Sequence, residues 1–310
     1  MSEQPSVVVL PFHAAEEARS RQAGVRRMLR LLLESRTGSV GFAIVLAVVT
    51  AALLAPLIAP YDPASQEITR ALKPPVWLGG PSGALLGTDN LGRDIFSRIM
   101  YGSQVSLIIG LSAVAVAGSL GFTLGVLSGY LGGWVDAVLM RLADFQLSVP
   151  FIVLAIAVLG VVGPSLQNLI VVLGITSWVS YARVARSEVL SLREREFVMA
   201  ARALGASSFR IMLIHIGPNV TAPAIILASL EVARMIISEA ALSFLGLGVP
   251  PPAPSWGGMV ADGRNYLESA WWIATFPGIA IVITVLGINL FGDWLRDTLD
   301  PRLRRWQGRR

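Results

Sequence analysis

Few side chains in this sequence are of the types that carry out bond chemistry. The 310 residues include no cysteine and two histidines, His13 and His215, which excludes disulfides, iron–sulfur clusters and histidine-rich metal sites. The single lysine, Lys73, is followed directly by Pro74, so it is not the lysine of a Gly-x4-Gly-Lys-Ser/Thr phosphate-binding loop. We therefore expect no catalytic residue, no metal site, no bound cofactor and no nucleotide hydrolysis by this chain.

Three ionisable residues stand inside an apolar stretch near the C-terminal third of the chain, namely Glu231, Arg234 and Glu239. Ionisable groups within a membrane span are costly and face the bundle interior or water, which makes them candidates for a transport pathway or gate. Glu231 and Arg234 are three residues apart, so on a helix they can also form a structural ion pair. The sequence leaves both interpretations open.

The elements that hold these residues are long apolar segments. Hydrophobic residues make up 54% of the chain and charged residues 15%, with mean hydropathy +0.65, which predicts an all-α polytopic membrane protein rather than a soluble domain. We expect six transmembrane helices between a cytoplasmic N-terminal segment (1–39) and a basic cytoplasmic tail (292–310). Their predicted ranges are 40–59, 105–128, 137–162, 166–182, 220–247 and 270–291, the last five forming a core over 105–291.

The segment 60–104 between the first two spans is rich in proline, glycine and aspartate and is expected to be a folded extracytoplasmic loop. Asp89, Arg93 and Asp94 lie near its end, where the interpretation we favour is that they cap and pair at a helix start; contact with a substrate is the alternative. In the third span, Arg141 and Asp144 are spaced to pair on one helical face.

Small residues recur every fourth position through the second span, at Ala113, Ala117, Gly121, Gly125 and Gly129. Small-xxx-small faces let two helices approach closely in lipid, so this helix is expected to pack inside the bundle. Flexibility for gating would use the same glycines, and the sequence does not separate the two.

The most distinctive stretch is the charged segment 188–219, which lies between two predicted spans. Apolar residues at helical spacing precede Gly205, Ser207 or Ser208 can cap a second helix, and Pro218 lacks the N–H needed to continue a helix simply. The segment predicts a helix, a glycine turn and a second short helix at the mouth of the bundle.

This stretch resembles the EAA cytoplasmic loop of ABC importer permeases, through Ala200-Ala201, Gly205 and Pro218-Asn219. Met199 stands where that family has the glutamate of EAA, and Gly217 stands where a leucine often precedes the proline. The effect of Met199 is open. Glu196, one helical turn earlier, is a possible substitute for the missing glutamate. Three further stretches resemble the dipeptide/oligopeptide/nickel branch of the family: LGTDNLGRDIFSRIMYGSQ (86–104), EAALSFLGLGVPPPAPSW (239–256) and the closing 292–303.

The resemblance implies a type I ABC importer permease fold with cytoplasmic coupling helices. It implies a second homologous permease subunit, one or two P-loop ATPase subunits that bind ATP and Mg²⁺, and an extracytoplasmic substrate-binding protein, with lipid around the bundle. The expected ATPase-coupling residues are Glu196, Ala200, Ala201, Gly205, Ala206 and Ser207. Peptide is the expected substrate, and nickel or another small solute is the alternative.

Basic residues set the expected orientation. The N-terminal segment, the link at 130–136, the region 183–219 and the tail hold 18 of the 25 basic residues, whereas the opposite loops hold 5. The positive-inside rule therefore places both termini and the segment 188–219 on the cytoplasmic side of the membrane, and the resemblance implies that this is a bacterial-type cytoplasmic (inner) membrane. We prefer membrane orientation to nucleic-acid binding as the interpretation of the net charge of +5. A helix-turn-helix regulator, a membrane enzyme and an ATP-independent carrier or channel are the rival functions, of which the carrier is the strongest on physical grounds alone.

Overall fold

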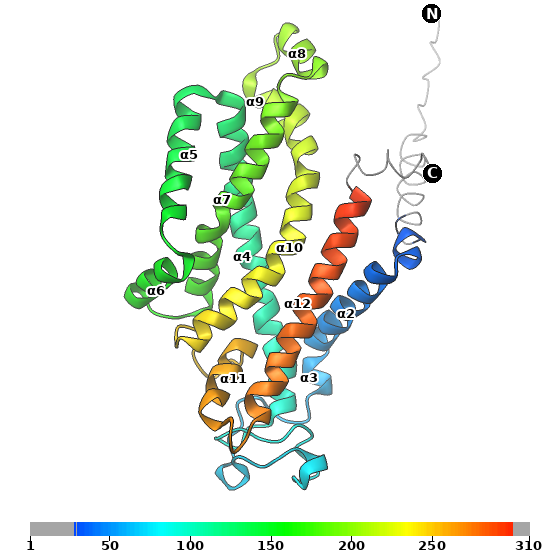
Figure 1. Ribbon diagram of the computed structural model, residues 1–310, viewed down its shortest axis with the longest axis vertical. Coiled ribbons are helices and arrows are strands. Elements are labelled where there is room, and N and C mark those ends of the chain that lie inside the picture. The colour runs from blue at the N-terminus through cyan, green and yellow to red at the C-terminus, as the bar shows by residue number, and fades with distance from the viewer. Residues whose placement is uncertain (1–27, 29, 300–310) are drawn as a thin grey trace, which may run out of the picture.

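The computed structural model describes residue 28 and residues 30–299 as a bundle of long helices (Figure 1). Five helical spans are long and apolar enough to cross a membrane, or six when the bent pair α5–α6 counts as one. The predicted N-terminal segment and tail fall largely outside the described residues. The helices are α2 (Arg36–Leu53), α3 (Ala55–Ile58), α4 (Ile95–Leu131), α5 (Gly133–Ser148), α6 (Phe151–Val162), α7 (Leu166–Leu192), α8 (Glu196–Ala203), α9 (Ser208–Arg210), α10 (Gly217–Phe244), α11 (Trp256–Gly263) and α12 (Trp272–Leu299).

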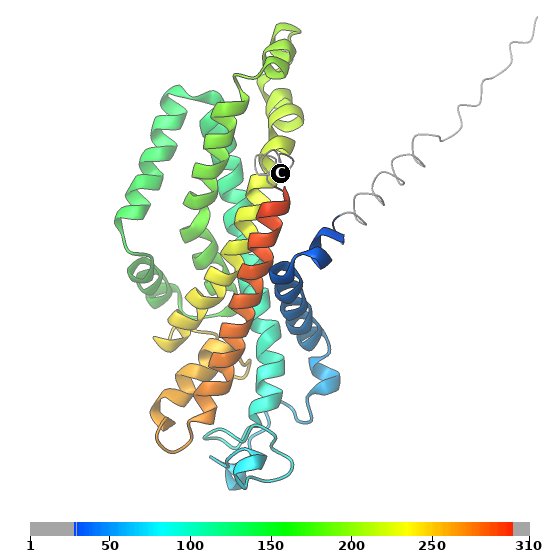
Figure 2. The same ribbon diagram turned by 45° about the vertical axis from the view of Figure 1, so that its right-hand side comes forward.

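The bundle has two distinct ends. The short helix α8 projects from one end, which we call the α8 end, and α11 lies at the other, the α11 end (Figures 1 and 2). The loop between α3 and α4 also lies at the α11 end and contains two short 3₁₀ helices, Ile68–Arg70 and Val76–Leu78. At the periphery α2 packs against α12, where Gly41 and Gly287 leave room for the opposing backbone and side chains.

The predicted third span, 137–162, is wrong as a single straight helix. The chain forms α5 and α6, bent by 88° at the break, and α6 lies across the bundle in Figure 1. Val149 is extended, with φ −100° and ψ 125°, and Pro150 precedes α6. A residue before proline is driven out of the helical region, so the run of apolar residues conceals a break.

Pro218 does not separate a second short helix from the fifth span, contrary to the prediction. A π-helical segment, Ile211–Ile216, joins α9 to α10, and Ser208–Phe244 is one span of 37 residues. Pro218 falls in the first turn of α10. Proline is tolerated at this position because the first backbone N–H groups of a helix donate to no carbonyl within that helix. Residues after Gly205 are therefore rigidly connected to a long membrane helix.

Three other helices run well past their predicted limits, and one of them, α12, continues to Leu299 instead of 291. α4 begins at Ile95 instead of 105, because the Asp94 carboxylate accepts a hydrogen bond from the Ser97 N–H (2.8 Å) and caps the helix. α7 continues to Leu192 instead of 182, because Arg186 pairs with Asp136 at the start of α5 (2.5 Å) and holds the last turns in place.

Candidate functional site

The helix α8 and the turn that follows it form a small knob beyond the bundle (Figure 1). Gly205 ends α8 with φ +81°, and the Gly205 N–H donates to the Arg202 carbonyl (3.0 Å). This left-handed conformation favours glycine, which has no Cβ to clash. Ser207 then caps α9 by accepting from the Arg210 N–H (3.4 Å). Local sequence therefore builds the turn, with Gly205 and Ser207 as its two fixed points.

One face of α8 is packed against the bundle. Val198 and Ala201 are buried and share a cluster with Val189 of α7 and Val220 of α10. Ala206 is half-buried against the same cluster. Among the described residues α8 packs chiefly against the π-helical segment Ile211–Ile216, which continues directly into α10. Ala201 thus lies on the inner side, although the sequence grouped it with Ala200 as one outward coupling surface.

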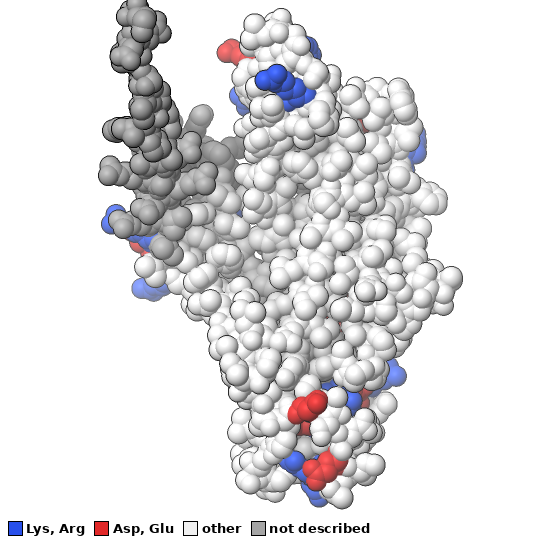
Figure 3. Space-filling view, turned by 180° about the vertical axis from the view of Figure 1, so that it is seen from behind, with Lys and Arg blue, Asp and Glu red and all other residues white. Residues whose placement is uncertain are grey.

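The other face of α8 presents apolar side chains to the outside. Phe197, Met199 and Leu204 are exposed, Leu204 at 88%, and Phe209 of α9 is 69% exposed. Ala200 lies exposed among them. The back view in Figure 3 shows this end as largely uncharged surface edged by basic and acidic groups. Exposed clusters of this kind mark surfaces that another molecule covers.

Sequence reasoning missed Met199, Leu204 and Phe209 as members of this face. The signal was present, because Phe197, Ala200 and Leu204 share helical spacing, but the same spacing describes a core-facing stripe. Glu196 lies in the first turn of α8, is exposed, and forms no ion pair within the described residues. Arg202 lies over the ring of Tyr130, 5.8 Å from its centroid.

The small residues of α4 lie along α7. Ala117, Gly121, Gly125 and Gly129 are all buried. A Cβ on Gly129 would stand 2.8 Å from the Val189 Cβ, and a Cβ on Gly125 would stand 2.7 Å from the Ala185 Cβ. The two backbones therefore approach as closely as glycine permits.

The three predicted pathway residues lie on α10 but not in one group. Glu231 is buried, and its carboxylate accepts from the Arg234 guanidinium (3.0 Å), whose side chain is 54% exposed. Glu239 lies two turns further along and is fully buried, accepting from Ser243 (2.6 Å) and from Ser255 before α11 (2.8 Å). Glu231 and Arg234 thus form the ion pair that their spacing allows, whereas Glu239 ties α10 to α11.

At the α11 end, four charged side chains form a network across 170 residues of sequence. Asp89 is fully buried and accepts from Arg93 (Nε, 2.6 Å) and from Arg98. Both guanidiniums also reach Asp262 of α11, at 3.4 and 3.3 Å. Asp89 and Arg93 pair as expected, but Arg98 and Asp262 could not have been assigned, since nothing in the sequence brings α11 to the start of α4.

A second expected pair, Arg141 with Asp144, is wrong. Asp144 instead pairs with Arg183 of α7 (2.7 Å). Asp144 lies within reach of Arg183 on the neighbouring helix, so an interhelical partner replaces the partner one turn away. Together with Arg186–Asp136, this pair fastens α5 to α7 on the side of the α8 end.

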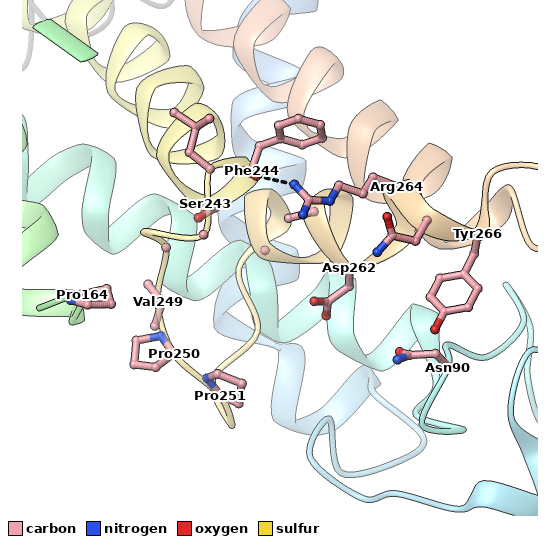
Figure 4. A pocket seen from close by; sticks show the side chains of 16 residues that line it. Asn90, Pro164, Ser243, Phe244, Val249, Pro250, Pro251, Asp262, Arg264 and Tyr266 are labelled. Carbon is pink, nitrogen blue, oxygen red and sulfur yellow. Dashed lines mark hydrogen bonds between the residues drawn. The ribbon is translucent and has the colours of Figure 1, made fainter. Parts of the chain in front are cut away.

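Two adjoining cavities open at the α11 end. One has a volume of about 530 Å³ and lies between the end of α10, the 245–251 loop and α11, with Asp262, Arg264 and Tyr266 in its wall (Figure 4). The other has a volume of about 380 Å³ and is lined by Arg93, Arg98 and the proline-rich segment 249–254. Within the described residues, no group of three or more histidine, cysteine, aspartate or glutamate side chains is placed to hold a metal ion.

The arrangement defines a multi-pass, all-helical membrane protein with polar groups inside the bundle and an apolar knob at one end. The chain belongs to the family described as binding-protein-dependent transport system inner membrane component, whose model matches residues 121–305, and residues 25–75 match the N-terminal TM domain of oligopeptide transport permease C. It is therefore an inner-membrane permease subunit of an ABC importer, a class that works with ATPase and substrate-binding partners.

Individual relatives cover most of the chain. It is 44% identical over 265 residues to the di/tripeptide transport system permease protein DppC of Pseudomonas aeruginosa, covering 85% of this chain and 88% of that one. It is 45% identical over 266 residues to the dipeptide transport system permease protein DppC of Escherichia coli K12, covering 86% and 89%. Among solved structures, an inward-facing MetNI methionine ABC transporter matches with TM-score 0.47 and 21% identity, over 62% of this chain and 93% of that chain.

Proposed function

We propose that this chain forms half of the translocation pathway of an ATP-driven importer of dipeptides or oligopeptides. In this proposal a second, homologous permease subunit supplies the other half, one or two ATPase subunits bind ATP and Mg²⁺, and an extracytoplasmic binding protein delivers the peptide. Support for the substrate comes from the relatives, which are named as dipeptide and di/tripeptide permeases and match this chain over 75–89% of their length. The chain itself catalyses no reaction in this proposal.

The observation that carries the coupling role is the two-sided burial of α8. Val198 and Ala201 are buried in the cluster that also contains Ile211 and Ile216, while Phe197, Met199 and Leu204 remain exposed. An ATPase groove that covers the exposed side gains about 1.5–3 kcal/mol for each large apolar side chain that it buries fully. Because α8 packs on the segment Ile211–Ile216, which is continuous with α10, displacement of α8 is transmitted to that membrane helix as a rigid-body movement.

The individual coupling residues have different roles in this account. Glu196 and Ala200 contact the ATPase directly, and Ala201 and Ala206 anchor the knob. Gly205 and Ser207 shape the turn. Met199 contributes an apolar contact where the related loops have a glutamate, and this is consistent with its 48% exposure.

The same proposal orients the protein with the α8 end in the cytoplasm and the α11 end outside. The exposed arginines Arg195, Arg202 and Arg210 all lie in the knob region, in agreement with the positive-inside rule. The start of α2 and the end of α12 point toward this end as well (Figure 1), which supports a cytoplasmic side for these two helix ends.

Cysteine cross-linking tests this proposal sharply because the native chain has no cysteine. Leu204→Cys, 88% exposed on the knob, is labelled with a maleimide–benzophenone reagent and is expected to cross-link to an ATPase subunit when the purified complex is illuminated. Leu267→Cys, 55% exposed at the α11 end, is the matched control and is expected to give no such product. Cross-linking of the ATPase from position 267, or from neither position, would contradict the coupling role of α8.

A further inference from the structure

The two arginines at the α11 end, Arg93 and Arg98, share two aspartate counter-ions that are held unequally. Asp89 is completely buried and lies close to both guanidiniums, whereas Asp262 is 44% exposed and stands 3.3–3.4 Å from them. Charge-assisted N–H···O bonds are usually about 2.7–2.9 Å long, so the contacts of Asp262 are long. Asp89 is a fixed counter-ion, and Asp262 is a loosely held one at the edge of the solvent.

The arginines themselves are held ready for an anion. Their side chains are only 7% and 6% exposed, yet both line the cavity of about 380 Å³. The Arg98 Nε is buried and has no hydrogen-bond partner among the residues that the structure describes. Two planar guanidiniums that line one cavity are suited to bidentate recognition of a carboxylate.

Asp262 stands at the junction of this cavity and its neighbour of about 530 Å³. Asn90, Val249, Pro251, Gly258 and Asp262 line both cavities. In Figure 4 the Asp262 carboxylate projects from α11 into the space between Asn90 and the proline-rich loop. Both volumes fall within the range of about 300–1,000 Å³ that is usual for small-molecule sites, so there is room for a short peptide next to the arginines.

From this geometry we infer that Arg93 and Arg98 form a subsite for the C-terminal carboxylate of a short peptide, with Asp262 occupying the place of that carboxylate when no peptide is bound. The inference rests on the proposed peptide transport and names the group of the substrate that the permease recognises. When a peptide enters, its carboxylate displaces the half-exposed Asp262, while Asp89 stays in place. The number of anions facing the two buried arginines is then unchanged, so neither guanidinium is left unneutralised.

The exchange gives Asp262 the role of an internal competitor. Removing its charge while preserving its shape, as in Asp262→Asn, leaves one positive charge facing the cavity. The variant is therefore expected to bind a peptide carboxylate more tightly, whereas a residue with a purely structural role would give unchanged or weaker binding. An arginine variant is less informative alone, because Arg98→Gln removes one of the two guanidiniums that pair with the buried Asp89 and endangers folding.

Binding of dialanine and of dialanine amide tests the inference. The amide has the same backbone and ammonium group but no carboxylate. Saturation-transfer NMR would be recorded on the purified permease–ATPase complex in lipid nanodiscs, without the binding protein. We expect dialanine to bind and the amide to bind at least tenfold more weakly, and Asp262→Asn to tighten dialanine binding at least fivefold without tightening that of the amide. Acetate is expected to compete with dialanine.

Other results would overturn the inference. Equal binding of dialanine and its amide would exclude a carboxylate subsite. Weaker binding of both compounds to Asp262→Asn would show that Asp262 instead holds the peptide ammonium group. Absence of dialanine binding in both wild type and Asp262→Asn would also refute it. If ATP-driven dialanine uptake persisted when the same complex was reconstituted in proteoliposomes with binding protein added, the failure would concern the subsite and not the proposed function.

Discussion

Replacing Gly125 of α4 by alanine tests whether the small-residue face serves close packing or flexibility. The added Cβ would stand 2.7 Å from the Ala185 Cβ, 2.9 Å from the Ala182 Cα, and closer still to the Ala182 carbonyl. Two of these neighbours are backbone atoms of α7, which yield only if the helices separate. Overpacking of this kind costs about 1–3 kcal/mol.

The helix propensity of alanine acts in the opposite direction. Alanine in a helix interior is favoured over glycine by about 1 kcal/mol, so the expected net change is a destabilisation of up to about 2 kcal/mol. Gly278→Ala in α12 is the matched control, because its Cβ would meet nothing within 4 Å. At position 278 no steric contact offsets the higher helix propensity of alanine, so a stabilisation of up to about 1 kcal/mol is expected.

Unfolding of the purified permease in mixed micelles, titrated with a denaturing detergent, would measure both changes. Packing predicts opposite signs for the two variants. If Gly125→Ala stabilised the protein as much as Gly278→Ala and yet abolished transport, the glycines would serve gating flexibility, and the packing argument for the α4–α7 contact would be refuted.

Three further predictions concern the knob and the start of α4. Leu204→Arg, at an 88% exposed position, should change stability by less than about 0.5 kcal/mol but weaken ATPase association about tenfold or more in a titration of the purified subunits; unchanged association would remove Leu204 from the interface. Gly205→Val places a β-branched residue at φ +81° and should abolish ATPase stimulation by loaded binding protein while the permease stays in the membrane, whereas Gly205→Asn, which tolerates that conformation, should retain it. Burial raises the pKa of the Asp94 carboxyl despite two hydrogen bonds from Ser97, so Asp94→Asn should be more stable than wild type above the folded-state pKa, and this advantage should shrink as pH falls toward the usual aspartate range. A stability difference between wild type and Asp94→Asn that did not vary with pH would contradict the sign. Asp94→Ala, which lacks a cap, should lose about 1 kcal/mol of stability.

Features specified by local sequence were predictable. Long apolar runs predict the membrane helices, and Gly205 predicts the turn after α8 because few other residues adopt its conformation. The i, i+3 spacing of Glu231 and Arg234 predicts their ion pair, which forms at 3.0 Å. In each case the physical cause lies within a few residues of the feature.

Features that depend on distant segments were not predictable. Asp262 reaches Arg93 and Arg98 across more than 160 residues, and Asp144 pairs with α7 because that helix lies alongside. The direction of the apolar stripe on α8 was equally hidden, since helical spacing is the same for an inward and an outward face. Val149-Pro150 is the exception, because the break between α5 and α6 follows from a local rule that the surrounding hydrophobicity concealed.

The proposed role of this chain, the permease half of an ATP-driven peptide importer, can be measured as uptake of radiolabelled dialanine into proteoliposomes. The purified complex is reconstituted, binding protein is added outside, and ATP or ADP is sealed inside. We expect uptake that requires both ATP and the binding protein and that is lost in Gly205→Val. Uptake of equal rate with ADP, or without the binding protein, would contradict it and identify an ATP-independent carrier.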